Sequence, residues 1–225
     1  TVVIECDTGQ KRAGVATPNE ALVLAKIVQN NPWLQFGGLM FYPPLHGWPA
    51  TQEFFNTTQA GLSSLGLVPK IISTGGTPNL KKLGLLDGAT EHRSGTSIFN
   101  DRMMMAAGVA NIEDCALTVY TTVVSRAEDT RGILDAGSKT LTADTGGLDG
   151  FGLVLEHPKA RIHKMAEEHG FIDISSCESR PSIGDIVRVV PNHVCVVVNM
   201  FDQLVAVREN HIVDVIPIDA RGRLV

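Results

Sequence analysis

The hydrophobic pattern of this chain changes near Val109, and that change restricts the folds that the chain can adopt. Before Val109, apolar runs of strand length alternate with segments that carry helix start signals. Alternating strands and helices predict a parallel β/α architecture. After Val109, short β-rich runs separated by turn residues predict a mainly antiparallel β domain. We therefore expect an α/β plus β protein with two domains, residues 1–108 and residues 109–225.

The clearest helix of the first half begins after Thr17. Thr17 is the expected N-cap, Pro18 takes the first helical position and Glu20 completes a capping box. The other expected elements are strands at 1–6, 36–41, 70–73 and 91–93, and helices after 48, near 78 and near 100–107. This pattern amounts to four β/α units.

The β-rich second half contains strands of a length typical of small β domains. The expected strands cover 116–125, 132–135, 184–190, 193–200 and 203–207. The segment Arg208-Glu209-Asn210-His211 fits a hairpin turn. Residues 158–170 fit either a helix or a strand.

The composition excludes several classes of protein. With 225 residues, 44% of them hydrophobic, and a net charge of −5, the chain can bury a large core. Its apolar stretches are too short and too interrupted to span a bilayer, and its N-terminus does not resemble a signal peptide, so we expect a cytoplasmic protein with no membrane partner. The four cysteines are dispersed, which argues against a disulfide framework. Mild acidity without basic clusters argues against nucleic acid as a partner.

His193 and Cys195 form a candidate metal-binding pair within the strand expected at 193–200. Side chains at i and i+2 share one face of a strand, so both could contact one cation. Imidazole and thiolate ligands favour Zn²⁺, with Mn²⁺ or another divalent metal as the alternative. Two ligands leave positions open for water or substrate, which is typical of a catalytic metal. The same two residues also fit a buried apolar cysteine beside a hydrogen-bonded histidine.

The segment Ser73-Thr74-Gly75-Gly76-Thr77-Pro78 joins an expected strand to an expected helix. Backbone N–H groups at such a turn, together with the helix dipole, can hold a phosphate. The segment lacks the lysine of a nucleotide P-loop, so ATP is not the expected ligand. A tight turn that binds nothing fits the same residues, but the position after the carboxyl end of a strand favours binding.

A second glycine-containing segment, Asp7 to Gly14, has the pattern D-x-G-x-x-R-x-G. It resembles the corresponding segment of alanine-racemase-like barrels that use pyridoxal 5′-phosphate. With the further segments that carry the likeness, the whole chain resembles the D-serine dehydratase and D-threonine aldolase family. Those segments are 73–78, Glu91-His92-Arg93-Ser94-Gly95, Asp135-Ala136-Gly137-Ser138-Lys139, Glu167-Glu168-His169-Gly170 and 191–199.

The resemblance implies the second half of a (β/α)₈ barrel, followed by a β domain that carries the metal pair. It implies a lyase that depends on pyridoxal phosphate and a divalent metal and acts on D-3-hydroxy amino acids. Dehydration to a keto acid and ammonia is the first expectation, because the histidine–cysteine pair resembles the dehydratase branch. Retro-aldol cleavage to glycine and an aldehyde is the alternative.

The resemblance also implies roles for individual residues. Arg12 is expected near the cofactor ring or its phenolic oxygen, although an ion pair with Glu5 or Asp7 would also explain it. His169 is a candidate acid or base, or an outer metal ligand, and a solvated surface residue is the alternative. The residues expected around the cofactor phosphate are Ser73, Thr74, Gly75 and Gly76, and those expected at the metal are His193 and Cys195.

The chain departs from the family in two respects. Ser97 stands where family members commonly have tyrosine, which removes a phenol from near the cofactor. A full barrel takes about 250 residues, whereas four β/α units precede the β domain, so the first half of the barrel and its cofactor-binding lysine are missing. Of the lysines that are present, Lys139 is the best candidate for the cofactor-binding lysine. Its place in the expected β domain argues against that role. We expect a complementary N-terminal polypeptide, which is either a separate chain, a proteolytic product or a region outside this sequence, and a homodimer of the complete unit.

Two other functional classes fit parts of the sequence. A non-catalytic protein could bind pyridoxal phosphate and metal reversibly without a lysine. A self-processed hydrolase could use Thr1 as an N-terminal nucleophile, although the chain has no G-x-S-x-G motif.

Overall fold

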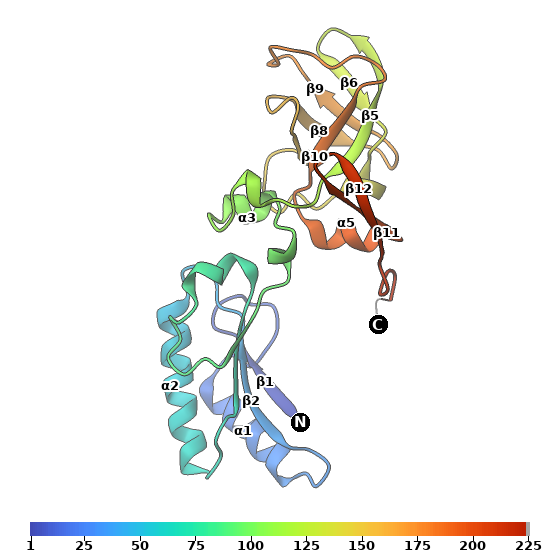
Figure 1. Ribbon diagram of the computed structural model, residues 1–225. Coiled ribbons are helices and arrows are strands. Elements are labelled where there is room, and N and C mark those ends of the chain that lie inside the picture. The colour runs from blue at the N-terminus through green and yellow to red at the C-terminus, as the bar shows by residue number, and fades with distance from the viewer. Residues whose placement is uncertain (224–225) are drawn as a thin grey trace. The chain divides into compact units, whose positions relative to one another are not determined.

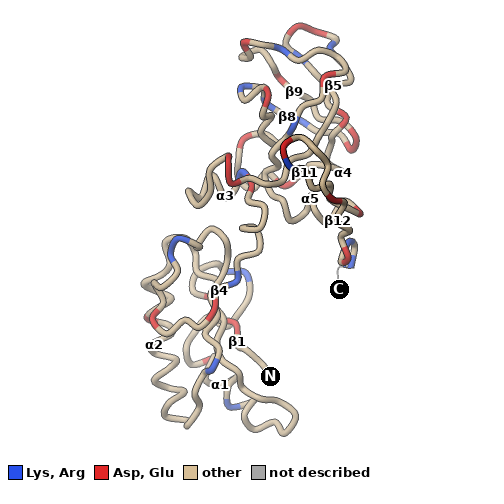
Figure 2. The backbone as a smooth tube through the Cα atoms, viewed as in Figure 1, with Lys and Arg blue, Asp and Glu red and all other residues tan. Residues whose placement is uncertain are grey.

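The computed structural model describes residues 1–223, and the chain divides into two compact units, Thr1–Ser97 and Ile98–Val225 (Figure 1). Each unit has its own hydrophobic core. The division falls earlier in the chain than the expected one at residues 108 and 109. Lysine and arginine are interspersed with aspartate and glutamate along both units (Figure 2).

The first unit contains a four-stranded parallel sheet with the strand order β1-β2-β3-β4. This arrangement confirms the expected β/α pattern, and the strand positions agree with those expected from the sequence. Helices follow the first two strands, as in a chain of β/α units. The strands are β1 (Val2–Cys6), β2 (Phe36–Phe41), β3 (Ile71–Gly75) and β4 (Glu91–Arg93), and the helices are α1 (Pro18–Asn30) and α2 (Trp48–Ser64).

Helix α1 begins at the capping box that the sequence predicts. The Thr17 hydroxyl accepts a hydrogen bond from the Glu20 backbone N–H at 3.3 Å, and the Glu20 carboxylate accepts one from the Thr17 N–H at 3.0 Å. The buried residues Ala21, Ala25 and Val28 recur at helical spacing and form the face that packs into the core. Local capping and the apolar face therefore specify the same helix.

Helix α2 packs against the sheet through aromatic side chains. Phe41, at the end of β2, makes edge-to-face contacts with Phe54 and Phe55, with ring centroids 6.1 and 6.2 Å apart. The helix expected near Pro78 is instead the short 3₁₀ helix η1 (Thr77–Lys82). The aromatic contacts fix the carboxyl end of β2 against α2.

The second unit is built on a closed, antiparallel, six-stranded barrel. The antiparallel pairing confirms the expected β domain, but its closure was not expected. Strand β10 closes the barrel because it pairs with β5 on one side and β7 on the other. The segment 158–170 contributes strand rather than helix. The barrel strands are β5 (Val119–Glu128), β6 (Arg131–Leu134), β7 (Leu153–Val154), β8 (Arg161–Met165), β9 (Gly170–Asp173) and β10 (Ile186–Val190).

A separate hairpin follows the barrel. It consists of β11 (Gln203–Arg208) and β12 (His211–Pro217). Glu209 and Asn210 both have positive φ, 50° and 64°, which is typical of the two-residue turns that join such strands. The hairpin turn expected at this position is therefore confirmed.

The strand expected at 193–200 is wrong, because Val194–Met200 forms the helix α5. Val194 and Val197 are buried, and Val198 and Phe201 pack against the same core, so the apolar positions follow a helical spacing of three and four residues. The β preference of a valine-rich run is weak, and this packing outweighs it. The remaining short helices are η2 (Thr96–Ile98), α3 (Arg102–Ala106), η3 (Ile112–Asp114) and α4 (Ser138–Leu141).

Across residues 1–223, no helix has both the length and the apolar character that a membrane crossing requires.

Candidate cofactor and metal sites

Ser73 and Thr74, two residues of the candidate phosphate loop, are held by side chains of the neighbouring strand β4. The Ser73 hydroxyl donates to the Glu91 carboxylate at 2.6 Å and accepts a hydrogen bond from Arg93. The Thr74 hydroxyl lies 2.8 Å from Nδ1 of His92. Both hydroxyls therefore tie β3 to β4, and the part of the loop left for a ligand starts at Gly75.

His92 bridges the two ends of this loop. Its Nε2 lies 3.2 Å from the Gly76 carbonyl oxygen. Because a carbonyl oxygen can only accept, Nε2 carries the proton and Nδ1 accepts from the Thr74 hydroxyl. Burial lowers the pKa of His92, since it disfavours the charged imidazolium. The neutral ring is the form that fits both partners.

The lowered pKa of His92 predicts a pH-dependent stability. The unfolded chain has an ordinary histidine pKa of about 6.5, so it binds the proton more readily than the folded chain, and stability falls as the pH drops through that value. We expect His92→Gln to lose less stability than wild type between about pH 7.5 and about pH 5.5, because glutamine can keep both hydrogen bonds without titrating. Urea unfolding at the two pH values measures the difference, and identical losses in the two proteins would contradict it.

Tyr42 connects Arg12 to the phosphate loop. A Cβ atom on residue 76 would overlap the Tyr42 hydroxyl and ring, so only glycine permits this close approach. The Arg12 guanidinium lies 4.7 Å from the centroid of the Tyr42 ring, a cation–π distance. Arg12 also makes the expected ion pair with Glu5, at 4.0 Å, but its side chain is 65% exposed, so this pair adds little stability. Tyr42 therefore contacts both Arg12 and the loop at Gly76. The sequence analysis did not predict this contact of Tyr42.

Thr77 carries a buried hydroxyl that has no hydrogen-bond partner within residues 1–223. The residue is 3% exposed. It begins η1, where the first backbone N–H groups of a helix have no intrahelical acceptor. An unpaired buried hydroxyl costs about 1–3 kcal/mol. Such an orphaned donor, next to Gly75 and Gly76, is what an anionic group with acceptor oxygens would satisfy.

The loop around Thr77 is rigidly supported. The Asn79 side-chain amide donates to the carbonyl oxygens of Pro43 at 2.7 Å and Gly75 at 3.3 Å. The Trp48 indole N–H donates to the Asn79 side-chain oxygen at 3.2 Å. These bonds join the carboxyl ends of β2 and β3, so the loop is already shaped without a ligand.

In the second unit, His193 is paired with a buried carboxylate. His193 is the N-cap of α5, and its Nδ1 lies 3.0 Å from Oδ2 of the completely buried Asp101. The hydrogen bond to Asp101 is the main reason that the pKa of His193 is raised. A carboxylate on Nδ1 leaves Nε2 as the nitrogen for a metal, as in carboxylate–histidine–metal arrangements. The sequence analysis did not assign Asp101 a role.

Cys195 is the second residue of α5 and its side chain is exposed. Because residues 194–200 are helical, the argument that His193 and Cys195 share one strand face is wrong. The residues from 1 to 223 include no group of three or more histidine, cysteine, aspartate or glutamate side chains that could hold a metal ion. His193 and Cys195 lie at the start of the helix as a pair of soft donors.

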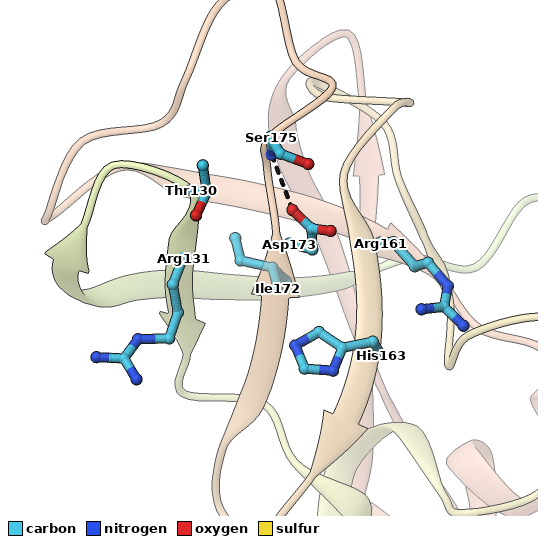
Figure 3. A pocket seen from close by; sticks show the side chains of 7 residues that line it. All are labelled: Thr130, Arg131, Arg161, His163, Ile172, Asp173 and Ser175. Carbon is cyan, nitrogen blue, oxygen red and sulfur yellow. Dashed lines mark hydrogen bonds between the residues drawn. The ribbon is translucent and has the colours of Figure 1, made fainter.

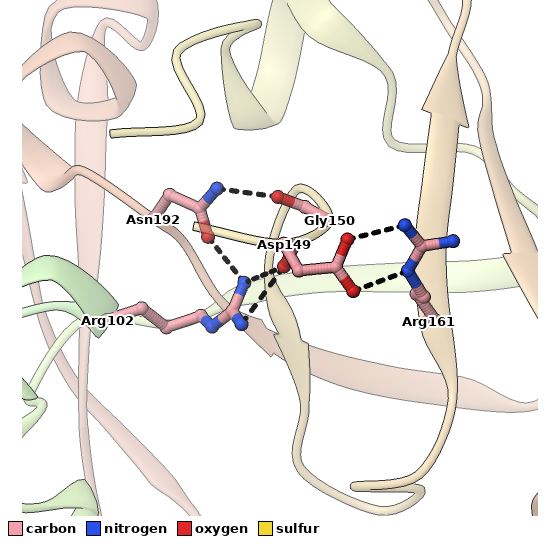
Figure 4. A network of polar contacts seen from close by, with 5 residues as sticks. All are labelled: Arg102, Asp149, Gly150, Arg161 and Asn192. Atoms are coloured by element: carbon pink, nitrogen blue, oxygen red, sulfur yellow. Dashed lines mark hydrogen bonds and ion pairs between the residues drawn. The ribbon is translucent and has the colours of Figure 1, made fainter. Parts of the chain in front are cut away.

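A polar network supports the segment that precedes His193. Arg102 donates to the Asn192 side-chain oxygen at 2.6 Å and to the Asp149 carbonyl oxygen at 3.2 Å (Figure 4). Asn192 is buried, and its amide donates to the Gly150 carbonyl oxygen at 2.8 Å. Asp149 is in turn ion-paired with Arg161. The network fixes the loop at Asp149 and Gly150 against the chain that leads into α5.

His169 lies in the turn between β8 and β9, and its side chain is exposed. The turn rests on the N-terminus of α4, where the backbone N–H groups of Ser138 and Lys139 donate to the carbonyl oxygens of residues 166 and 167 at 2.9 and 3.0 Å. A Cβ atom on Gly137 would overlap this turn, so glycine is required for the close approach. The two family segments at 135–139 and 167–170 thus pack together and fix the backbone position of His169.

A shallow hollow of about 390 Å³ lies on the barrel strands β6, β8 and β9 (Figure 3). Its cationic residue Arg161 is already bound by Asp149, and the Asp173 carboxylate accepts from the Ser175 N–H at 2.9 Å. Arg131 and Arg161 are the register partners of Asp173 on the two neighbouring strands, and they form ion pairs with Glu128 and Asp149, respectively. The hollow has the character of a cross-strand charge ladder. The residues that line it are Thr130, Arg131, Arg161, His163, Ile172, Asp173 and Ser175.

Comparison with known proteins identifies relatives over the whole chain. The family described as a putative serine dehydratase domain matches residues 116–207. A D-threonine aldolase from Arthrobacter sp. is 30% identical over 98% of this chain and 61% of its own length. The chain therefore spans less than two thirds of this relative.

Solved structures of an aldolase and a dehydratase are also similar to this chain. The D-threonine aldolase of Filomicrobium marinum superposes with a TM-score of 0.87 at 24% identity, over 99% of this chain and 64% of that protein, which supports the fold alone. The D-threo-3-hydroxyaspartate dehydratase of Delftia sp. HT23 has a TM-score of 0.76 at 26% identity, over 95% and 64% of the two chains. Structures of two single variants of a D-threo-3-hydroxyaspartate dehydratase also match this chain. One variant replaces a histidine by alanine, and the other replaces a cysteine two positions later by alanine. The structure of the cysteine variant is described as the metal-free form.

Proposed function

This chain belongs to the D-serine dehydratase and D-threonine aldolase family, and on that premise we propose that it forms part of a lyase acting on D-3-hydroxy amino acids. Its relatives are aldolases and dehydratases, and its structural neighbours have an alanine-racemase-like fold. We propose that the lyase depends on pyridoxal 5′-phosphate and on a divalent metal.

The unpartnered Thr77 hydroxyl is the observation that carries this proposal. It is buried beside Gly75 and Gly76, at the carboxyl end of a parallel strand, where a phosphate would supply the missing acceptors. The backbone from Gly75 to Thr77 and the Thr77 hydroxyl would hold the phosphate. Ser73 and Thr74 would support the loop through β4 rather than through their own contacts with the ligand. When bound, the cofactor supplies an electron sink for bond cleavage at the substrate α-carbon.

Arg12 and His169 are two further residues with a proposed role, one in each unit. Arg12, stacked on Tyr42, would place a positive charge at the edge of the cofactor loop. His169 would hold or move a proton as an acid or base, from a turn whose backbone is fixed by α4. Ser97 cannot supply the family phenol, whereas the Tyr42 hydroxyl already lies against Gly76.

His193 and Cys195 are the proposed metal ligands. The Asp101 carboxylate on Nδ1 of His193 leaves Nε2 for coordination, and the dehydratase variants alter a histidine and a cysteine at the same two-residue spacing. The soft sulfur donor favours Zn²⁺ over Mg²⁺ or Ca²⁺, with Mn²⁺ as the alternative. When bound, the metal would stabilise negative charge on the substrate hydroxyl.

We propose dehydration to a keto acid and ammonia as the reaction. In support, the dehydratase variants alter a cysteine two positions after a histidine, which is the spacing of Cys195 and His193. Retro-aldol cleavage is the second candidate, because an aldolase is 30% identical over nearly the whole chain. Product analysis with D-serine and D-threonine distinguishes the two, since only cleavage of the Cα–Cβ bond releases glycine.

A complementary polypeptide is part of the proposal. Within the described residues, the parallel sheet ends at β1 and β4, which each pair with one neighbouring strand. The carboxyl end of β1 also bridges Val15, and the rest of both edges could pair with further strands. We do not propose Lys139 as the cofactor lysine, because it lies in the second unit and its amine is ion-paired with Glu167 and Glu168, both at 2.8 Å. We propose that the partner polypeptide supplies further barrel strands and the lysine, and that the complete unit forms a homodimer.

Replacing Thr77 by valine tests the phosphate site with opposite effects on stability and affinity. We expect the ligand-free variant to be at least as stable as wild type, because an unpaired buried hydroxyl is removed without a change of shape. We expect it to bind pyridoxal 5′-phosphate about tenfold more weakly, the equivalent of one hydrogen bond to a charged group. Fluorescence titration with pyridoxal 5′-phosphate, and with pyridoxal as a ligand without phosphate, measures the affinity.

Thr58→Val is the matched control for this variant. Thr58 is also a buried threonine, but its hydroxyl donates to the Phe54 carbonyl oxygen at 2.8 Å. The control should lose stability and keep its affinity for the cofactor. Equal binding of pyridoxal and pyridoxal 5′-phosphate to wild type would refute the phosphate site, and reversible binding by a complete assembly without a lysine adduct would indicate a non-catalytic protein.

A further inference from the structure

We infer that Asp101 is the positioning residue that fixes the orientation and tautomer of His193, and thereby makes Nε2 of His193 competent to bind the metal. This inference rests on the proposed metal site and adds a residue to it. It follows from the contacts of one buried carboxylate, that of Asp101.

The Asp101 carboxylate is completely buried and has three donors around it. Oδ1 accepts from the Met104 backbone N–H at 2.9 Å. Oδ2 accepts from the Val194 backbone N–H at 3.0 Å and lies 3.0 Å from Nδ1 of His193. An ionised carboxylate only accepts hydrogen bonds, so the short contact requires the proton on Nδ1. In a neutral imidazole, Nε2 then carries the lone pair that a metal needs.

The same carboxylate also fixes where the ring can lie. Asp101 accepts hydrogen bonds from the Met104 N–H at the start of α3 and from the Val194 N–H at the start of α5. It therefore joins the N-termini of these two helices. The ring is thus held by a group that cannot move without breaking both caps. A surface carboxylate on a flexible chain could not restrict the ring in this way.

The backbone on both sides of the contact is equally constrained. The Arg102 and Met103 backbone N–H groups donate to the carbonyl oxygens of Pro191 and Asn192 at 3.2 and 3.1 Å. The Arg102 side chain binds the Asn192 side-chain oxygen at 2.6 Å (Figure 4). Residues 101–103 are therefore hydrogen-bonded to residues 191–194 at several positions. The Asp101–His193 contact is the one among these that involves a proposed metal ligand.

Asp101→Ser separates the positioning role from the capping role. Serine is a good N-cap, so it can keep the bond to Met104, but it is too short to reach His193. We expect the variant to bind Zn²⁺ about 10–100-fold more weakly than wild type, the range for loss of an outer partner of a ligating histidine. Competition with a chromophoric chelator measures the affinity. Asp114→Ser is the matched control, because exposed Asp114 accepts only the local Asn111 N–H in its own capping box and should leave Zn²⁺ affinity unchanged.

A second measurement tests the inference independently of metal binding. In metal-free wild type with ¹⁵N-labelled histidine, two-dimensional NMR should show the His193 proton on Nδ1, and Asp101→Ser should lose this preference. A proton on Nε2 of His193 in wild type, or unchanged Zn²⁺ affinity in folded Asp101→Ser, would overturn the inference. If Asp101→Ser does not fold, the wild-type tautomer alone decides. Wild type that binds no Zn²⁺ but keeps the proton on Nδ1 would reject the metal site and leave the positioning contact intact.

Discussion

Replacing His193 by alanine is expected to weaken Zn²⁺ binding by at least about 100-fold, more than the loss of an outer partner, because it removes one of two protein ligands. The remaining thiol of Cys195 cannot form a tight site alone. The buried Asp101 would lose its side-chain partner but keep the Met104 and Val194 N–H groups, so the unit should remain folded. Chelator competition gives the affinity, and circular dichroism confirms the fold.

His211→Ala is the control for this experiment, since His211 is an exposed histidine in β12. It should bind Zn²⁺ as wild type does. Cys195→Ser provides the second arm, because a hydroxyl is a much poorer ligand for zinc than a thiolate. Wild-type affinity in either His193→Ala or Cys195→Ser would exclude that residue from the metal site.

Replacing Gly76 by alanine is expected to destroy cofactor binding and to destabilise the first unit by about 1–3 kcal/mol, the range for overpacking. The new methyl group would overlap the Tyr42 hydroxyl and ring, and Tyr42 also contacts Arg12. One substitution would therefore displace the phosphate loop and the arginine beside it. Urea unfolding and titration with pyridoxal 5′-phosphate measure the two effects.

Gly95→Ala is the control, because a Cβ atom at that position meets no other atom within 4 Å. A double-mutant cycle tests the mechanism more closely. Tyr42→Ala removes the colliding side chain, so Gly76→Ala should cost much less stability in that background, and the two changes should be non-additive. Additive losses would mean that Gly76 is needed for a reason other than its contact with Tyr42.

The elements whose local signals agree with their packing were predicted correctly. The capping box of Thr17 and Glu20 specifies α1, and the apolar run at β2 is buried on both faces of a parallel sheet. The turn at Glu209 and Asn210 was likewise predicted from local residue types. In each case the neighbouring residues alone determine the backbone conformation.

The failures arose where distant contacts decide the structure. Valines suggested a strand at 193–200, but the carboxylate of Asp101, far away in the sequence, binds the Val194 N–H at the start of α5. Barrel closure depends on β10 pairing with both β5 and the two-residue strand β7, which is too short to give a periodic signal. Neither relation can be deduced from the residue types within one segment.

The candidate sites divide in the same way. Sequence motifs and the family resemblance predicted the phosphate loop, Arg12 and the pair His193 and Cys195 as site residues, and these assignments stay predictions. They gave no individual role to Asp101 or Thr77, since a helix-capping aspartate and a loop threonine are common. Asp101 becomes notable because it is completely buried, and Thr77 because its buried hydroxyl has no partner among the described residues. Ser73 and Thr74 were predicted to lie around the phosphate, and the structure adds that their hydroxyls are bound to Glu91, Arg93 and His92.

The central proposal is that the phosphate loop and the metal pair of this chain serve a pyridoxal-phosphate lyase in which a complementary half-barrel supplies the lysine. Intact mass spectrometry of the native protein after borohydride reduction tests it most directly. The account predicts a second polypeptide that carries a pyridoxyl adduct on a lysine. A preparation that contains this chain alone, stays soluble and monomeric, and carries no adduct would contradict it.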